Sequence, residues 1–320
     1  MKIGLFTTVL GSLGVRDLIA KVKALGHVEA LELGTGGWPG HAHVDVHALA
    51  DPARARQFGQ MIADAGLSIS ALSCHSNPLH PDATVAREAD EVFRRSVRLA
   101  AQLGVSVVIT FSGCPGDADN AKHPNWITTP WPPEYLETLE WQWTEKAVPY
   151  WTDTAHFAAD HGVRVALEPH PGFLVYNPET ALRLRDAVGD TIGVNFDPSH
   201  MYWQGIDVPT AIGVLGPAIF HVHAKDVLLD RGNIAANGVL DAKSYRQMRG
   251  RSWLFRSVGW GHDEVEWKRT ISALRLAGYD SVLSIEHEDA LLSIDEGLQQ
   301  AVTFLSRLVP AEPPAEPWWT

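Results

Sequence analysis

The chain has 320 residues, with 26 Lys and Arg against 38 Asp and Glu, so its formal net charge is −12. Hydrophobic residues make up 45% of the chain and charged residues 20%, which is typical of a globular protein and excludes a disordered one. Because binding to phosphates needs a surplus of Lys and Arg, the acidic balance argues against nucleic acid as a partner.

Cysteine content and apolar runs bear on the cellular compartment. Cys74 and Cys114 are too few for a disulfide framework, which favours a reducing environment. No run approaches the roughly 20 apolar residues of a membrane span, and the first residues are more typical of a strand than of a signal peptide. We therefore expect a cytoplasmic protein that has no membrane partner.

Taken in chain order, short apolar runs alternate with longer amphipathic segments. Strands are expected at 2–7, 28–33, 68–73, 105–111, 163–168, 191–197, 218–223 and 281–286. Between them, apolar residues at helical spacing predict helices at 15–25, 52–65, 84–103, 138–161, 178–187, 264–277 and 293–308. A strand followed by a helix, repeated about eight times, predicts one α/β domain, a (β/α)8 TIM barrel over residues 1–308.

Three segments fall outside this repeat. Connections 112–137 and 225–263 are long and follow strands, so both should lie at the carboxyl-end face, where such barrels keep their active sites. The Pro-rich segment 309–320 should form an extended C-terminal tail. We expect its Trp318 and Trp319 to dock in an apolar groove of the barrel or of a neighbouring subunit, because burial of two indoles offsets the entropy of ordering the tail.

Four of the expected strands end in residue types that bind metals, namely Glu168, Asp197, His223 and Glu286. Period-2 alternation points all four into the barrel, together with the residues two positions earlier, Ala166, Asn195, His221 and Ser284. Burying three carboxylates on one rim is costly without a cation, so the pattern predicts one divalent metal. Three carboxylates and one imidazole favour Mn²⁺, with Mg²⁺, Co²⁺ and Zn²⁺ as alternatives.

These segments resemble the xylose-isomerase-like barrel superfamily of sugar isomerases and epimerases. The resemblance covers nearly the whole chain and is carried by Glu168-Pro-His, Asp197-Pro-Ser-His200, His221-Val-His223-Ala-Lys-Asp226 and Ile-Glu286-His. It implies a metal held by Glu168, Asp197, His223 and Glu286. It also implies that Glu168 and Glu286 take part in proton transfer, and that His200 contacts metal or substrate.

Other residues are placed where a substrate would bind. The stretch from Arg256 to Gly261 resembles a Gly-x-Gly element of the superfamily, which implies that Arg256 meets a substrate oxygen. His75 follows the strand at 68–73 and His170 follows the metal-binding Glu, so both can line the pocket.

Two tryptophans and a lysine complete the candidate site residues. Trp38 and Trp203 lie in loops after strands, where they either pack the loops or stack on a sugar ring or an aromatic aglycone. Lys225 lies two residues after His223, and it either pairs with Asp226 or binds substrate.

The superfamily resemblance implies proton abstraction next to a carbonyl, through an enediolate. The first hypothesis is therefore a divalent-metal-dependent isomerase or epimerase that acts on a sugar or keto-sugar. The length and the Trp-rich loops also resemble the large subunit of bacterial enzymes that cleave 3-oxo-C-glycosides, so a lyase with a small partner subunit is the second. A non-catalytic sugar-binding barrel is the third. The expected partner is a small carbohydrate, with a homo-oligomer or the small subunit as the possible protein partner.

Overall fold

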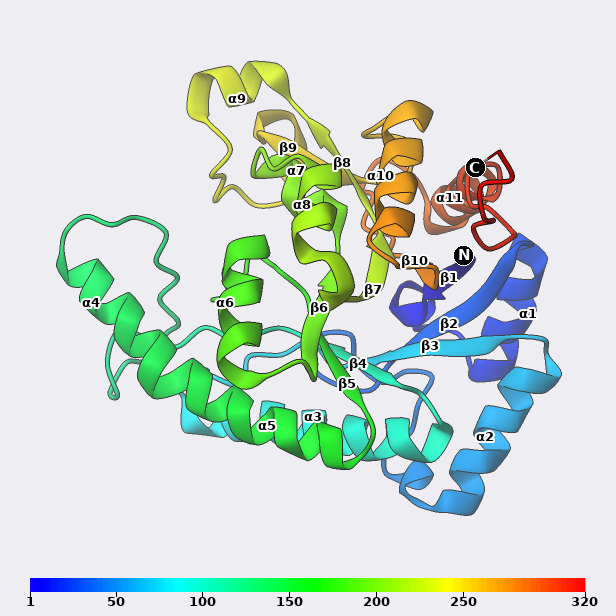
Figure 1. The fold of residues 1–320 in the computed structure, drawn as a ribbon, viewed down its shortest axis with the longest axis horizontal. Helices are drawn as coiled ribbons and strands as arrows, with labels where there is room; N and C mark the ends of the chain where they lie inside the picture. The colour runs from blue at the N-terminus through cyan, green and yellow to red at the C-terminus, as the bar shows by residue number, and fades with distance from the viewer. Residues whose placement is uncertain (320) are drawn as a thin grey trace.

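The computed structural model describes residues 1–319, and eight of its strands pair in parallel to close a barrel (Figure 1). The strands are β1 (Lys2–Phe6), β2 (Val28–Gly34), β3 (Ser68–Ser73), β4 (Val107–Thr110), β5 (Arg164–Leu167), β6 (Ile192–Phe196), β7 (Ile219–Ala224) and β10 (Val282–Ile285). β10 lies between β7 and β1 and so closes the ring. Each of the eight barrel strands lies where an apolar run predicted a strand, and the predicted TIM barrel is confirmed.

Helices on the outside of the barrel follow the strands (Figure 1). Those at predicted positions are α1 (Val15–Leu25), α2 (Pro52–Asp64), α3 (Ala83–Leu103), α6 (Pro178–Val188), α10 (Glu264–Leu276) and α11 (Ile294–Ser306). The helix expected at 138–161 is longer and composite, with α4 (Glu134–Trp141), the π-helical η3 (Gln142–Ala147) and α5 (Val148–Asp160) in succession. Within residues 1–319, no helix combines the length and apolarity needed to cross a membrane.

Three helices lie outside the predicted ranges. α8 (Val208–Leu215) has eight residues and is apolar at most positions, so its sequence does not stand out as an amphipathic segment. α7 (Pro198–Trp203) and α9 (Arg231–Asn237) are too short to show a helical period. The remaining helical turns are 3₁₀ segments, namely η1 (Thr7–Leu10), η2 (Ala48–Ala50), η4 (Gly216–Ala218) and η5 (Met248–Gly250).

The wall of the barrel is buried on both faces. The residues that precede the four predicted ligands in sequence point the other way and join the main hydrophobic core, namely Leu167, Phe196, Val222 and Ile285. A separate small apolar cluster consists of Ala71, Val107, Ile109, Ala166 and Phe220. Because side chains alternate along each strand, the polar residues at the strand ends share a face with the smaller set.

Both long connections follow strands, as predicted, and one of them contains a hairpin that the sequence did not reveal. β8 (Asp226–Leu229) pairs antiparallel with β9 (Trp253–Arg256), and α9 lies between them (Figure 1). The two strands are separated by 23 residues, so no two-residue turn signal marks the hairpin. The hairpin places the aromatic side chains of β9 beside the end of β7.

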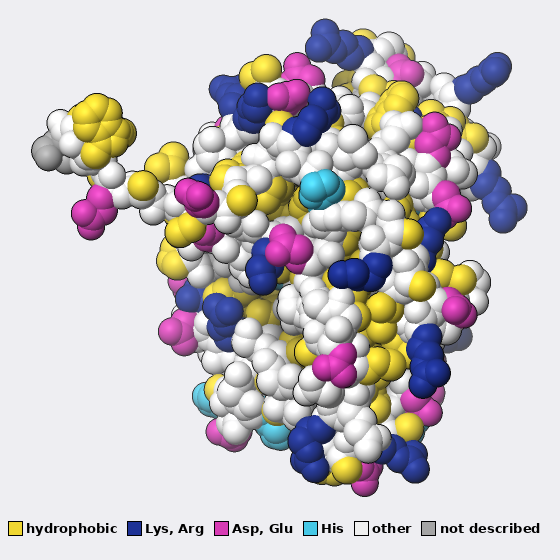
Figure 2. Space-filling model, turned by 90° about the vertical axis from the view of Figure 1, so that its right-hand side faces the viewer, with side chains coloured by type: hydrophobic (Ala, Val, Ile, Leu, Met, Phe, Trp, Pro, Cys, Tyr) yellow, Lys and Arg dark blue, Asp and Glu magenta, His cyan; other side chains and the backbone are white. Residues whose placement is uncertain are grey.

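The tail is extended, as predicted, but its tryptophans do not dock on the barrel. Trp318 is 89% exposed and Trp319 is 71% exposed. The chain is held near its start, where the N-terminal ammonium donates to Pro310 O at 3.2 Å and Arg275 donates to Glu312 O at 2.5 Å. Beyond these contacts the end of the chain projects from the body as an arm (Figure 2). The expected docking in a groove of the same barrel is therefore wrong, and docking on a neighbouring subunit stays a prediction.

Deleting residues 313–320 should remove an assembly contact and leave the barrel's own stability unchanged. The exposed Trp318 and Trp319 bury little against their own chain, so their loss costs the single barrel little hydrophobic free energy. In sedimentation velocity, the full chain should form a species larger than a monomer, and the truncated chain should not. A full chain that sediments as a monomer at all accessible concentrations would contradict this prediction.

Candidate metal centre

The four predicted metal ligands meet at the carboxyl ends of the barrel strands. Glu168 follows β5, Asp197 is the N-cap of α7 after β6, His223 lies in β7 and Glu286 follows β10. One donor atom from each lies within 4.8 Å of those of the others. Glu286 is partly accessible and the other three are buried. We call these four residues the carboxylate–histidine cluster.

Residues two positions before the cluster residues point into the barrel, as strand alternation predicted, and they hydrogen-bond to the cluster. Asn195 Nδ2 donates to Glu168 Oε2 at 2.9 Å, and Asn195 Oδ1 accepts from His221 Nδ1 at 2.9 Å. Burial lowers the pKa of His221 to about 4, so the ring is neutral and its Nδ1 carries the proton. This chain of hydrogen bonds orients one carboxylate oxygen of Glu168.

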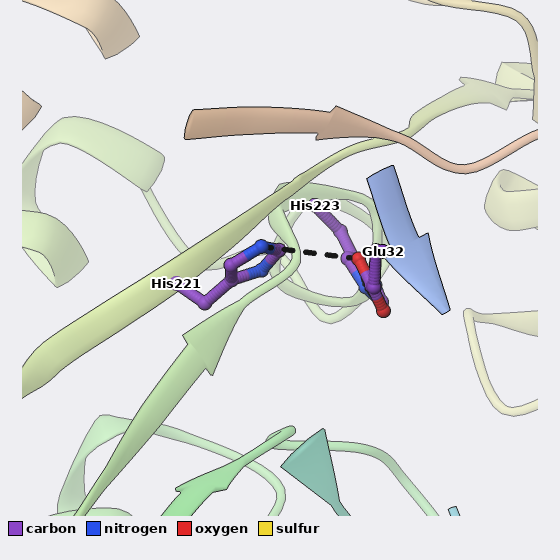
Figure 3. Close-up of side chains that lie close together, drawn as sticks. All are labelled: Glu32, His221 and His223. Atoms are coloured by element: carbon purple, nitrogen blue, oxygen red, sulfur yellow. Dashed lines mark hydrogen bonds and ion pairs between the residues drawn. The ribbon is translucent and has the colours of Figure 1, made fainter. Parts of the chain in front are cut away.

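Glu32, on β2, is a fourth carboxylate in the barrel, and the sequence analysis missed it. It is fully buried and accepts hydrogen bonds from His223 Nε2 at 3.0 and 3.1 Å, from Ser284 Oγ at 2.7 Å and from Ser73 Oγ. Figure 3 shows its side chain pointing toward His223 and His221. Burial opposes ionisation of Glu32, but the His223 ring and these hydrogen bonds lower its pKa to about 2.

A signal for Glu32 was present in the sequence. Residues 30–32 and 166–168 have the same order, Ala-Leu-Glu, in two expected strands. In both, the Leu joins the outer core and the Glu is buried on the inner face. A charged residue that shares a face with a small apolar one in a buried strand predicts an inward-pointing charge. Glu32 lies inside its strand, whereas Glu168 follows the end of its strand, and the ligand prediction rested on residues at strand ends.

Two buried atoms of the cluster that could coordinate a metal, Asp197 Oδ2 and His223 Nδ1, have ion-pair contacts but no hydrogen-bond partner. The ring donates from Nε2 to Glu32, so a neutral ring has a lone pair on Nδ1. That atom lies 3.2 Å from Glu168 Oε2 and 2.9 Å from Glu286 Oε2. Burial opposes a charge on the ring, yet the surrounding carboxylates raise the pKa of His223 well above its ordinary value. The donor set therefore fits a positive charge at this point, and three oxygen ligands with one nitrogen fit a divalent metal.

Lys225 brings a positive charge to the same cluster. Its Nζ lies 3.1 Å from Asp197 Oδ2, 3.0 Å from Glu286 Oε2 and 3.1 Å from Glu288 Oε2. Burial opposes the charge, but these carboxylates raise the pKa of Lys225 well above its ordinary value. The pairing with Asp226 that the sequence left open does not form, and the ammonium instead offsets part of the negative charge of the cluster.

Two predicted site histidines lie against Glu168. His75 Nε2 is 3.1 Å from Glu168 Oε2. His200 Nε2 is 3.4 Å from both Glu168 Oε1 and Asp197 Oδ2, and neither of its ring nitrogens has a hydrogen-bond partner although the side chain is buried. His200 therefore offers a buried nitrogen beside the cluster.

His170 lies one layer further out. Its ring centre is 4.0 Å from that of His200, and its Nδ1 donates to Pro171 O at 2.7 Å. Burial lowers the pKa of His170 to about 3, so the ring is neutral. Because Nδ1 carries the proton, Nε2 retains a lone pair that can accept a hydrogen bond.

Comparison with known proteins decides the family. Residues 19–308 match the family described as xylose isomerase-like TIM barrel. The chain belongs to this family. The resemblance predicted from the motif segments is thereby confirmed.

Relatives of the xylose isomerase-like barrel cover its whole length. The uncharacterized protein YfiH of Bacillus subtilis (strain 168) is 37% identical over 313 residues, which are 97% of this chain and 99% of YfiH. The solved structure of an L-ribulose 3-epimerase has a TM-score of 0.64 at 17% identity, over 97% of this chain and 95% of that one. The IOLI protein with a binding zinc atom has a TM-score of 0.64 at 19% identity, over 97% and 98%. These structures share the fold.

The remaining predicted substrate residues of this family member are spread around the cluster. Trp203 is buried and stacks on Trp253 with ring centres 4.7 Å apart. Trp38 is 64% exposed, with its ring centre 5.4 Å from that of Phe111. Arg256 is buried, and its Nε donates to Asp289 Oδ2 at 3.0 Å. The structure thus brings His75 and His200 to the cluster and leaves the roles of these three side chains as predictions.

The Gly-x-Gly element of this barrel is held by Asp226. Its carboxylate accepts from the backbone N–H groups of Gly259, Gly261 and His262 at 3.0 to 3.2 Å, and from Trp267 Nε1 at 3.2 Å. A Cβ on Gly261 would lie 2.2 Å from Val227 O and 2.5 Å from Asp226 Oδ1, so only glycine fits there. The segment that carries Arg256 is thereby tied to β8.

Proposed function

We propose that the protein is a divalent-metal-dependent isomerase or epimerase that acts on a sugar or keto-sugar. The observation that carries this proposal is the convergence of Glu168, Asp197, His223 and Glu286, each of which offers one possible ligand atom within 4.8 Å of the others. The family supports it, because the fold neighbours include an L-ribulose 3-epimerase and a zinc-binding protein. Mn²⁺ suits three carboxylates and one imidazole.

The chemistry would take place next to a carbonyl. Glu168, Asp197, His223 and Glu286 would hold a divalent cation, which would supply Lewis-acid polarisation of the substrate carbonyl. Glu286, the partly accessible carboxylate, removes the proton from the hydroxyl-bearing carbon next to the carbonyl, and the C–H electron pair forms a C=C bond while the carbonyl oxygen takes the negative charge. The Lys225 ammonium, which lies 3.0 Å from Glu286 Oε2, would donate a hydrogen bond to the substrate oxygen that takes this charge.

The product depends on where a proton is returned. If Glu286 returns it to the former carbonyl carbon, while the hydroxyl proton moves to the former carbonyl oxygen and the hydroxyl oxygen becomes the new carbonyl, the result is isomerisation. If Glu168 takes the hydroxyl proton and delivers it to the original carbon from the opposite face, while Glu286 passes its proton to the hydroxyl oxygen, the carbonyl re-forms and the result is epimerisation. His75 and Asn195, which contact Glu168 Oε2 at 3.1 and 2.9 Å, hold this carboxylate in place.

A second function uses the same intermediate. If the carbon next to the enediolate carries a leaving group, the electron pair of the enediolate can expel that group, and the bond to it breaks. The enzyme would then be a lyase for 3-oxo-glycosides, including C-glycosides. A cavity of about 880 Å³ that touches His170 and His200 favours this candidate, because it has room for an aglycone. A small partner subunit would accompany the protein in that case. The converging donor set argues against a barrel that only binds sugar.

Metal analysis joined to deuterium exchange tests the proposal. We expect about one Mn²⁺-class ion per chain, loss of activity with a chelator, and recovery when Mn²⁺ is added back. With a panel of keto-sugars and keto-glycosides in D₂O, deuterium on carbon would identify the moved proton, and a released aglycone would reveal elimination. Protein without any divalent ion, active in the presence of chelator, would overturn the proposed metal dependence.

A further inference from the structure

A groove lies at the amino-end face of the barrel, at the opposite end from the carboxylate–histidine cluster. It has a volume of about 540 Å³ and is bounded by α2, the start of β3 and the end of α3. We call it the α2–α3 groove. Most of its lining is apolar or glycine, including Gly59, Ala63, Leu67, Ile69, Leu103 and Gly104. An apolar groove of this kind can receive a hydrophobic segment of another chain.

Gly59 keeps the α2–α3 groove open, and packing within the barrel does not require a glycine there. The residue lies inside α2, where glycine lowers helix stability relative to alanine. A Cβ at this position would lie 3.6 Å from Leu103 Cδ2, which is an ordinary van der Waals contact. The missing side chain therefore relieves no clash within the chain, and its effect is to leave room in the groove.

The arm, residues 313–319, carries an apolar pair that its own chain does not cover. Trp318 and Trp319 are 89% and 71% exposed, and their ring centres lie 5.9 Å apart with an interplanar angle of 90°. Figure 2 shows the end of the arm clear of the body. The prolines at positions 313, 314 and 317 restrict the backbone, so the arm loses less conformational entropy on binding than a flexible tail would.

The arm begins on the same face of the barrel as the groove. Its root is tied to the N-terminal ammonium, just before β1, and to Arg275, in the last turn of α10. The strands of such a barrel start, and its helices end, at this face, and Figure 1 shows α2 and the C-terminus on the same side of the molecule. In a polyproline II conformation, at about 3.1 Å per residue, the arm spans roughly 20 Å, which is long enough to reach a second barrel that faces this one.

The charges of the arm and the groove are complementary. Arg56 is the charged residue among those that line the groove, and its exposed side chain forms no ion pair within the part of the chain that the structure describes. The arm brings the exposed Glu316 two residues before its tryptophan pair. Because the chain has a net charge of −12, another copy repels an acidic segment over much of its surface, and a groove with an unpaired arginine favours it.

The area that two arms can bury matches that of a stable dimer. An aromatic side chain buries roughly 150–250 Å², so the four indoles of two reciprocal arms would bury roughly 800 Å². The walls of the two grooves would lose a similar area, and the sum of roughly 1,600 Å² is the standard size of a specific protein interface.

We propose that two copies of this chain form a dimer in which the arm of each lies in the α2–α3 groove of the other. Trp318 and Trp319 lie on the apolar wall of the groove, and Glu316 lies beside Arg56. One two-fold axis relates the two contacts, so the assembly closes at two copies. The carboxyl-end face stays open, and the carboxylate–histidine cluster of each copy remains accessible.

Exchanging the charges across the interface tests this assembly. Sedimentation equilibrium should give a dimer for the native chain. Arg56→Glu and Glu316→Arg should each weaken dimerisation roughly tenfold, because each replaces an attraction by a repulsion in both halves of the dimer. The double variant should recover to within about threefold of the native affinity, since the pair is restored with its charges reversed. A native chain that is monomeric, or a double variant that is as weak as the single ones, would overturn the proposal.

Two further variants place the contact and exclude loss of fold. Arg54→Glu is the matched control, because Arg54 is also exposed on α2 but does not line the groove, and this variant should dimerise as the native chain does. Trp319→Ser should weaken dimerisation roughly 100-fold, since one indole is lost from each half. Circular dichroism and the melting temperature of a dilute, monomeric sample should be unchanged, because the arm lies outside the barrel. If Arg56→Glu dimerises as well as Arg54→Glu, the arm binds elsewhere and the assignment is wrong.

Discussion

Replacing Glu286 by glutamine should lower the rate of proton exchange between substrate and D₂O by about 10²–10⁴-fold, the range typical of a general base. Glutamine has nearly the same shape but cannot accept the proton. The variant should remain folded, because Glu286 follows β10 at the rim and is partly accessible. Single-turnover exchange measured by NMR, with circular dichroism as the folding check, tests both statements.

Glu288→Gln is the matched control for this prediction. Glu288 contacts the same Lys225 ammonium at 3.1 Å, but it is not one of the four converging ligands. Its replacement removes the same charge from the neighbourhood and should reduce exchange far less. If Glu286→Gln exchanges protons at the native rate, another group removes the proton and the assigned role is wrong.

Replacing Glu32 by glutamine should weaken metal binding by about 10–100-fold, the usual cost of losing a carboxylate partner of a ligating histidine. Glu32 accepts from His223 Nε2 at 3.0 and 3.1 Å, and it thereby sets which nitrogen of the ring faces the cluster. A neutral amide would accept the same proton but would no longer raise the basicity of the ring. Competition titration with a chromogenic chelator measures the change.

Glu29→Gln controls for the change of charge on the same strand. Glu29 also lies on β2 but is exposed, so its replacement should leave metal affinity unchanged. A Glu32→Gln protein that binds metal as tightly as the native protein would show that Glu32 is only a packed structural group. Thermal unfolding of both variants without metal separates a loss of fold from a loss of affinity.

The order of strands and the face on which each side chain lies could be read from local pattern. Apolar runs located all eight barrel strands, and period-2 alternation placed Asn195, His221 and Ser284 on the same face as the cluster. Such patterns are local, because each depends on residues a few positions apart. Alternation turns the four side chains of the cluster toward the inside of the barrel. They meet at one rim because parallel strands of a barrel end on the same side.

Features that depend on distant partners could not be read in this way. Glu32 and His223 are 191 residues apart, and only closure of the barrel brings them together. β8 pairs with β9 across an intervening helix, and Lys225 contacts three carboxylates rather than the adjacent Asp226. The tail likewise projects from the body, although its composition favoured burial of its indoles.

The sequence by itself thus determined the barrel, its strand faces and the convergence of the four side chains of the carboxylate–histidine cluster. Only the tertiary structure showed which charged groups pair, where the cavity beside the cluster lies and where the tail projects. The physical reason is that periodicity records which side of an element is buried, whereas hydrogen bonds and ion pairs depend on the atoms that the closed barrel brings within about 3 Å of one another.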